Sequence, residues 1–133
     1  MTTLVTPETP DWPWKNFQRH ELECHCGCGQ MKMDPWVMYI VQGLRDYLGF
    51  PLCLSSAYRC PRHDRAVRSK RGQESIGFHT RGTEVDVHRL TPAQLYRLVD
   101  AALDEGVTGV GFGKTFVHLG WGKRPTPRVI WTY

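Results

Sequence analysis

The stretch FHTRGTEVDV, residues 78–87, decides how the rest of the chain is interpreted. It places His79 and Asp86 seven residues apart, with Gly82 between them. Glycine lets the backbone bend, so the two side chains can converge. After the glycine, valines alternate with acidic residues, which predicts a strand with one apolar face. We interpret the stretch as a turn and a strand that supply two ligands of a metal site.

A third ligand is predicted in FVHLGW, residues 116–121, where Val117 and Leu119 flank His118. Alternation turns His118 to the face opposite these apolar neighbours. If its strand pairs with the strand of Asp86, the two side chains meet. Two imidazoles and one carboxylate leave a fourth position open, as in catalytic zinc sites. Non-haem iron accepts the same ligands. A histidine taken alone is more often an ordinary polar residue than a ligand.

Composition restricts the class of protein. The chain has 133 residues, of which 23% are charged, and this favours a single folded domain. No apolar run approaches the roughly 20 residues that span a bilayer. The N-terminus lacks a charged segment followed by an apolar one, so we expect synthesis in the cytoplasm without a signal peptide. The net charge is +4, yet no nucleic-acid motif occurs. The basic residues at 59–71 and 123–128 fit either an anionic polymer, such as cell wall, or a solvated loop.

The pattern of caps and apolar residues predicts a small α+β domain. Residues 1–16 are expected to form an irregular arm whose tryptophans dock on a single domain, residues 17–133. Asp34-Pro35 and Thr91-Pro92 are typical helix starts. We expect an antiparallel sheet flanked by two or three helices, with the zinc site on its face. The expected helices are 34–49, 61–70 and 91–106, the expected strands are 51–57, 84–88, 107–112, 116–120 and 129–133, and 17–23 is a short turn or strand.

Five cysteines admit more than one interpretation. Cys24, Cys26 and Cys28 alternate with other residues, and alternation in an extended chain would point them the same way. Cys60 and Cys53 follow later. The loop could form a disulfide with Cys60, build a second metal site with Cys60 or His63, or hold free buried thiols. Because five is odd, at least one thiol stays unpaired within the chain.

Several segments together resemble the zinc D-Ala-D-Ala carboxypeptidase and L-alanyl-D-glutamate endopeptidase family of peptidoglycan peptidases, in its compact phage and bacterial branch. They are CHCGCG (24–29), LRDYLGFP (44–51), SAYRCPRHDRAV (56–67), HTRGTEVD (79–86), VGFG (110–113) and FVH (116–118). The resemblance implies that His79, Asp86 and His118 bind Zn²⁺. It implies that Arg59 hydrogen-bonds the substrate's carboxylate or scissile carbonyl, a task that suits a guanidinium fork. Tyr58 and Ser75 are further candidates for substrate binding.

The chain departs from its relatives after the last ligand. Relatives typically read His-x-Asp, and here Gly120 takes the place of the aspartate. No acid or histidine precedes His118 at the position that some relatives use for the general base. We rank His88 first as proton acceptor, since alternation puts it on the same strand face as Asp86. Glu84, Asp64 and Glu74 follow.

These features predict a zinc peptidase that hydrolyses a bond in peptidoglycan stem peptides, resembling an endolysin or a tail-associated hydrolase of a bacteriophage. We expect a monomer that reaches the wall after lysis, holin release or virion delivery, with a phage tail or lysis assembly as partner. No nucleic acid and no membrane-spanning segment are expected. The alternative is a non-enzymatic descendant that keeps the zinc as a structural or wall-binding module.

Overall fold

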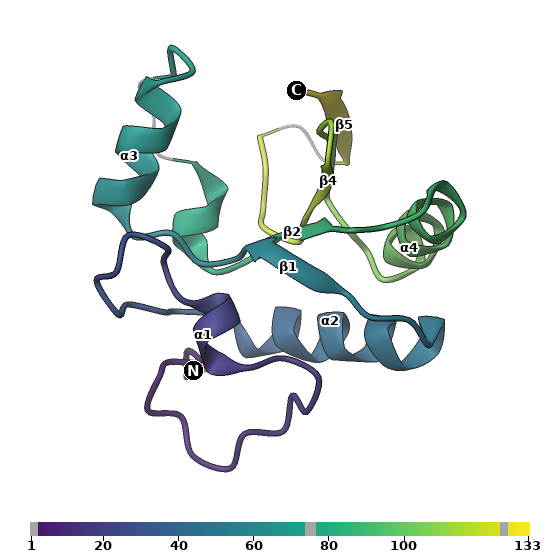
Figure 1. Ribbon diagram of the computed structural model, residues 1–133, viewed down its shortest axis with the longest axis horizontal. Helices are drawn as coiled ribbons and strands as arrows, with labels where there is room; N and C mark the ends of the chain where they lie inside the picture. Colours follow the sequence, from purple (N-terminus) through teal and green to yellow (C-terminus); the bar gives the residue numbers. More distant parts are fainter. Residues whose placement is uncertain (1–2, 74–76, 126–127) are drawn as a thin grey trace.

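A five-stranded sheet forms the centre of the protein, in the strand order β1-β2-β4-β3-β5 (Figure 1). The computed structural model describes residues 3–73, 77–125 and 128–133. The strands are β1 Cys53–Ser56, β2 Glu84–His88, β3 Gly109–Phe112, β4 Phe116–Gly120 and β5 Val129–Thr132. The predicted α+β class is confirmed.

The sheet is mixed, whereas the sequence predicts an antiparallel one. The pairs β1–β2, β2–β4 and β4–β3 are antiparallel, but β5 runs parallel to β3. The chain reverses direction after β4 and joins the sheet beyond β3. Because β3 and β4 are themselves antiparallel, a strand that reverses β4 must run parallel to β3.

In the described part of the chain, four helices and one 3-10 turn surround the sheet. They are α1 Arg19–Leu22, α2 Pro35–Leu48, α3 Pro61–Ser69, η1 Phe78–Arg81 and α4 Pro92–Asp104. The predicted caps are present: Asp34 accepts from the Trp36 amide at 2.8 Å, and Thr91 forms a capping box with Gln94. The short helix α1 replaces the predicted turn or strand. No helix of the described ranges is long and apolar enough to cross a membrane.

Alternation along the strands divides the sheet into an apolar and a polar face. Val85 and Val87 of β2 and Val117 and Leu119 of β4 are buried, and α2 and α4 contact each other beside this core (Figure 1). The residues between these apolar ones must face the other way. The polar residues of β2 and β4 therefore gather on one face, beside α3 and β5.

The N-terminal arm docks on the body as the sequence predicts. Trp14 is buried, with 3% of its surface exposed, and the Trp12 ring lies 4.9 Å from it. The Trp12 indole donates to the Phe17 carbonyl at 2.7 Å. An isolated bridge joins Val5 to Met33.

Candidate metal centre

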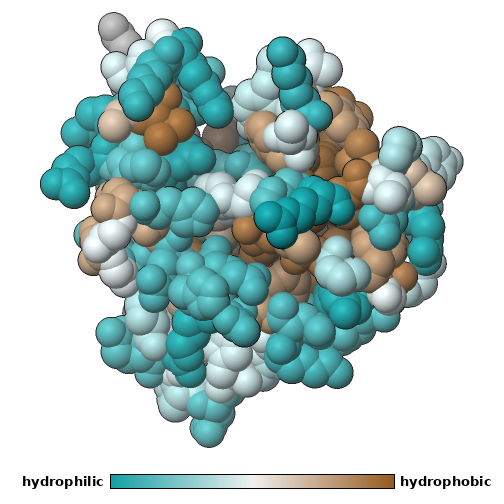
Figure 2. Space-filling view, in the orientation of Figure 1, coloured by the Kyte–Doolittle hydropathy of each residue, from teal (hydrophilic) through white to brown (hydrophobic). Residues whose placement is uncertain are grey.

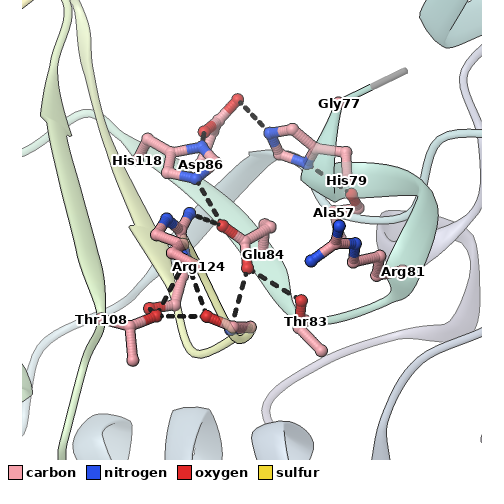
Figure 3. A network of polar contacts seen from close by, with 12 residues as sticks. Ala57, Gly77, His79, Arg81, Thr83, Glu84, Asp86, Thr108, His118 and Arg124 are labelled. Carbon is pink, nitrogen blue, oxygen red and sulfur yellow. Dashed lines mark hydrogen bonds and ion pairs between the residues drawn. The ribbon is translucent and has the colours of Figure 1, made fainter. Parts of the chain in front are cut away.

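Three buried side chains from three elements converge on the polar face of the sheet. His79 comes from η1, Asp86 from the middle of β2, and His118 from β4 directly opposite Asp86. His79 Nε2 lies 3.4 Å from Asp86 Oδ2, and His118 Nδ1 lies 2.9 Å from Asp86 Oδ1 (Figure 3). Their ligand atoms all lie within 4.8 Å of one another. The structure thus brings together the three ligands proposed from the sequence.

Hydrogen bonds select which nitrogen of each histidine faces the centre. His79 Nδ1 donates to the Ala57 carbonyl at 2.7 Å, so Nε2 keeps its lone pair. In the neutral His118 ring that a metal requires, Nε2 donates to Glu84 Oε1 at 2.9 Å and Nδ1 keeps its lone pair. Both lone pairs point toward Asp86. Histidines that bind zinc usually donate their other nitrogen to a carbonyl or carboxylate in this way, and the residues therefore fit a zinc ion with an open fourth position.

Glycines flank the turn that carries His79. Gly82 has φ +72°, in the left-handed region, and a side chain there would meet the Lys32 carbonyl. Before the histidine, the Gly77 amide donates to Asp64 Oδ2 at 2.6 Å. The turn that carries His79 is therefore held at both ends.

Ionisation of the two carboxylates is favoured by their contacts. Burial disfavours the charge of Asp86, but the imidazoles of His118 and His79 beside its carboxylate outweigh burial and hold the pKa of Asp86 well below its usual range. Burial opposes the charge of Glu84 too, and the hydrogen bond and charge of His118, with the charge of Arg124, lower its pKa to about 2. For His118, burial acts against the cation, while Asp86 and Glu84 raise its pKa. Asp86 is therefore an anion at neutral pH, as a metal ligand must be.

Glu84 lies next to Gly120, the position at which the relatives have an aspartate. It faces Gly120 in the register of β2 and β4, and its carboxylate occupies the space that a side chain at position 120 would need. It is fully buried and accepts from His118, Arg124, Thr83 and the Gly122 amide. The carboxylate that accepts from His118 Nε2 therefore belongs to Glu84 of β2, and not to a residue at position 120 of β4.

Arg59 lies beside the three candidate ligands and is fixed by its own partners. Its Nη1 donates to Asp64 Oδ1 at 2.9 Å, its Nη2 to Ser56 Oγ at 3.4 Å, and its amide to the His79 carbonyl at 3.3 Å. The Asp64 side chain is completely buried. A guanidinium held by a carboxylate keeps further N–H donors for a ligand.

A cleft of about 380 Å³ opens over the three candidate ligands and is lined by residues of α3 and β5. The space-filling view shows the surface hollowed between the lobe that carries α3, mostly covered by hydrophilic residues, and the lobe of the last strands (Figure 2). Besides the ligands, the cleft is lined by four arginines and four aromatic residues: Arg59, Arg68, Arg71, Arg124, Phe78, Phe116, Trp131 and Tyr133. The cleft therefore joins a cationic rim to apolar walls, which suits an anionic ligand with small apolar groups.

Two other predicted site residues, Tyr58 and His88, lie away from the cleft. Tyr58 is buried, with 3% exposed, and does not line this cleft. His88 ends β2 and lines two other hollows of the surface, so the structure does not bring the first-ranked base to the ligands. Alternation assigns a face but not the distance along the strand. Ser75 and Glu74 lie outside the described residues.

Arg124 and Trp131 are site residues that the sequence did not reveal. Arg124 bonds Glu84 beneath His118, and the Trp131 ring lies 5.2 Å from the His118 ring. A side chain at Gly109 would collide with Arg124, and one at Gly111 with Trp131. The glycines of the β3 segment were the available signal, because they mark where another chain segment approaches closely.

The site consists of two histidines and a carboxylate with buried hydrogen-bond partners, at the floor of an open cleft. This arrangement defines a candidate hydrolytic zinc site. A family model described as peptidase M15 matches residues 15–120. The chain belongs to the peptidase M15 family, as the sequence resemblance implies, and hence to a family of zinc-dependent peptidases that act on peptidoglycan. A search of curated proteins finds no match.

Proposed function

We propose that the protein is a zinc-dependent peptidase that hydrolyses a peptide bond in the stem peptides of bacterial peptidoglycan. The observation that carries the proposal is the arrangement of His79, Asp86 and His118. Each histidine offers one lone pair beside Asp86, and its second nitrogen is occupied by a buried acceptor. Membership of the peptidase M15 family supports the same function.

In this proposal His79, Asp86 and His118 hold the metal. Zinc, when bound, supplies a Lewis acid that lowers the pKa of a water molecule and polarises a carbonyl group. Ala57 and Glu84 keep the two imidazoles in the required tautomers. Fixed ligands avoid reorganisation during the reaction, which is the main contribution that a folded site makes to catalysis.

The cleft suits the chemistry of a stem peptide. Stem peptides carry free carboxylates and alanine methyl groups. The arginines around the cleft attract the carboxylates, and the aromatic walls accept the methyl groups. Arg59 is the arginine best placed to donate to a substrate carbonyl or carboxylate, because Asp64 holds it beside His79.

Arg59→Lys is expected to lower kcat by about 10²-fold, which is the usual effect of losing one donor to the developing oxyanion. Lysine keeps a cation for Asp64 but loses the second donor of the fork. The measurement is the rate of amine release from purified peptidoglycan, together with zinc content, which should not change. Arg62→Lys is the matched control, since Arg62 is exposed on α3. An unchanged rate in Arg59→Lys would remove Arg59 from the mechanism.

The function is tested by incubating zinc-loaded and chelator-treated protein with purified peptidoglycan. Zinc-dependent release of D-alanine identifies a carboxypeptidase. A new amino terminus on D-glutamate identifies an L-alanyl-D-glutamate endopeptidase, and one in a cross-bridge identifies a third specificity. Intact peptidoglycan after incubation with zinc-loaded protein would contradict the proposal.

A non-enzymatic zinc-binding module is the second candidate, and one observation favours it. Among the described residues that line the cleft, the acidic ones are Asp64 and Asp86. Asp64 pairs with Arg59 and Gly77, and Asp86 pairs with both histidines. Neither is free to take up a proton. Tight zinc binding without cleavage in the incubation above would support this candidate.

The route to the wall remains a prediction. We propose that the protein acts as an endolysin-like or tail-associated hydrolase, delivered by lysis, holin release or a virion, and that it acts as a monomer. Its support is the basic sequence of α3 beside the cleft, PRHDRAVRS, which can attract an anionic wall without a partner.

A further inference from the structure

The loop of three cysteines folds back on itself and against Cys60. Residues 25–28 form turns, and Gly27 and Gly29 have φ of +85° and +74°. The Cys24 amide donates to the Gln30 carbonyl at 2.9 Å, which closes the loop. The segment is therefore not the extended chain in which alternation would point the three thiols the same way. Left-handed glycines, not strand alternation, turn the thiols toward one another.

The four thiols lie at the spacing of a metal site. Cys24 Sγ is 3.5 Å from Cys26 Sγ, which is 3.7 Å from Cys60 Sγ. The sulfur atoms of Cys24, Cys26, Cys28 and Cys60 all lie within 4.8 Å of one another. A Zn–S distance of about 2.3 Å gives about 3.8 Å between sulfurs at the corners of a tetrahedron. A disulfide needs about 2.05 Å, and all five cysteines are free thiols.

We propose that Cys24, Cys26, Cys28 and Cys60 bind a second zinc ion with a structural role. Four thiolates close the coordination shell and leave no position for water, as in structural zinc sites. Backbone amides already point at two of the sulfurs: His63 N donates to Cys60 Sγ at 3.4 Å, and Gln30 N to Cys28 Sγ at 3.5 Å. Such N–H donors stabilise thiolates that bind a metal.

The position of the site explains what it would stabilise. Cys60 caps the start of α3 and directly follows Arg59, whose amide donates to the His79 carbonyl. A zinc ion bound there ties the 24–30 loop to this corner of the chain. The second zinc therefore holds the segment from which Arg59 reaches the cleft, without itself lying in the cleft.

Metal content and cobalt spectra of the reduced protein test the inference independently of the proposed function. We expect two zinc ions per chain in the wild type and in Cys53→Ser, a control whose thiol lies in β1 outside the cluster. Cys60→Ser and Asp86→Asn should each retain one. With cobalt in place of zinc, thiolate-to-metal charge-transfer absorption should appear in the wild type and in Asp86→Asn, and be lost in Cys60→Ser.

Cys28→Ser is a second variant that separates loss of zinc from misfolding, because Cys28 is exposed and its substitution removes no core side chain. It should also lose one zinc and weaken the thiolate absorption. Full zinc content in both cysteine variants, or no thiolate absorption in the wild type, would overturn the second site. Loss of zinc only in the cysteine variants would instead contradict the His79, Asp86 and His118 centre and leave this inference standing.

Discussion

Asp86→Asn is expected to lower peptidoglycan hydrolysis by about 10³-fold or more and to remove the zinc held by His79 and His118. The amide keeps the shape of the side chain but not its charge, and Asp86 is the residue that both histidines face. A bound metal stabilises the transition state by several kcal/mol. Each 1.36 kcal/mol of activation free energy changes the rate tenfold, which gives the expected decrease of about 10³-fold.

The measurement pairs amine release with zinc content per chain. Asp100→Asn is the matched control, since Asp100 is exposed on α4, and it should keep both wild-type values. Thermal unfolding of both variants checks that the fold is retained. Asp86→Asn with wild-type zinc content and rate would show that the three side chains are not the catalytic metal site.

Glu84→Ala is expected to have the second large effect. It leaves Arg124 buried without its carboxylate, and breaking a buried ion pair from one side costs about 3–5 kcal/mol. It also removes the acceptor of His118 Nε2, which should weaken zinc binding by about 10–100-fold. Urea unfolding and a zinc titration measure the two effects.

The double variant Glu84→Ala/Gly120→Asp tests whether Glu84 replaces the aspartate of the relatives. Gly120→Asp alone should destabilise the protein, because the new side chain collides with the Glu84 carboxylate. The pair should be more stable than the sum of the single effects predicts, by at least about 1 kcal/mol, as for residues in contact. If the stability losses of the two single variants simply add in the double variant, an aspartate at position 120 does not replace the Glu84 carboxylate.

Much of the candidate site follows from local sequence rules. Alternation around Asp86 and His118 places both on the polar side of their strands, and the left-handed Gly82 allows His79 to join them. The caps at Asp34 and Thr91 define the long helices in the same local way. These features depend on neighbours in the chain, so a sequence pattern records them.

The features that were missed depend on contacts between distant segments. Glu84 shares a strand face with Asp86, but its role depends on the register that sets it opposite Gly120. Arg124 comes from a turn without periodicity and meets Glu84 only in the folded chain. His88 was ranked first as the base because strand alternation puts it on the same face as Asp86. It lies at the end of β2, however, away from the cleft.

Digestion of purified peptidoglycan in water enriched in oxygen-18 tests the central claim most directly. With zinc-loaded wild-type protein, mass spectrometry should find new stem-peptide fragments that carry one heavy oxygen in the new carboxyl group. Asp86→Asn should yield none above background. Absence of such fragments from the wild type, or equal amounts from Asp86→Asn, would contradict a zinc peptidase built on His79, Asp86 and His118.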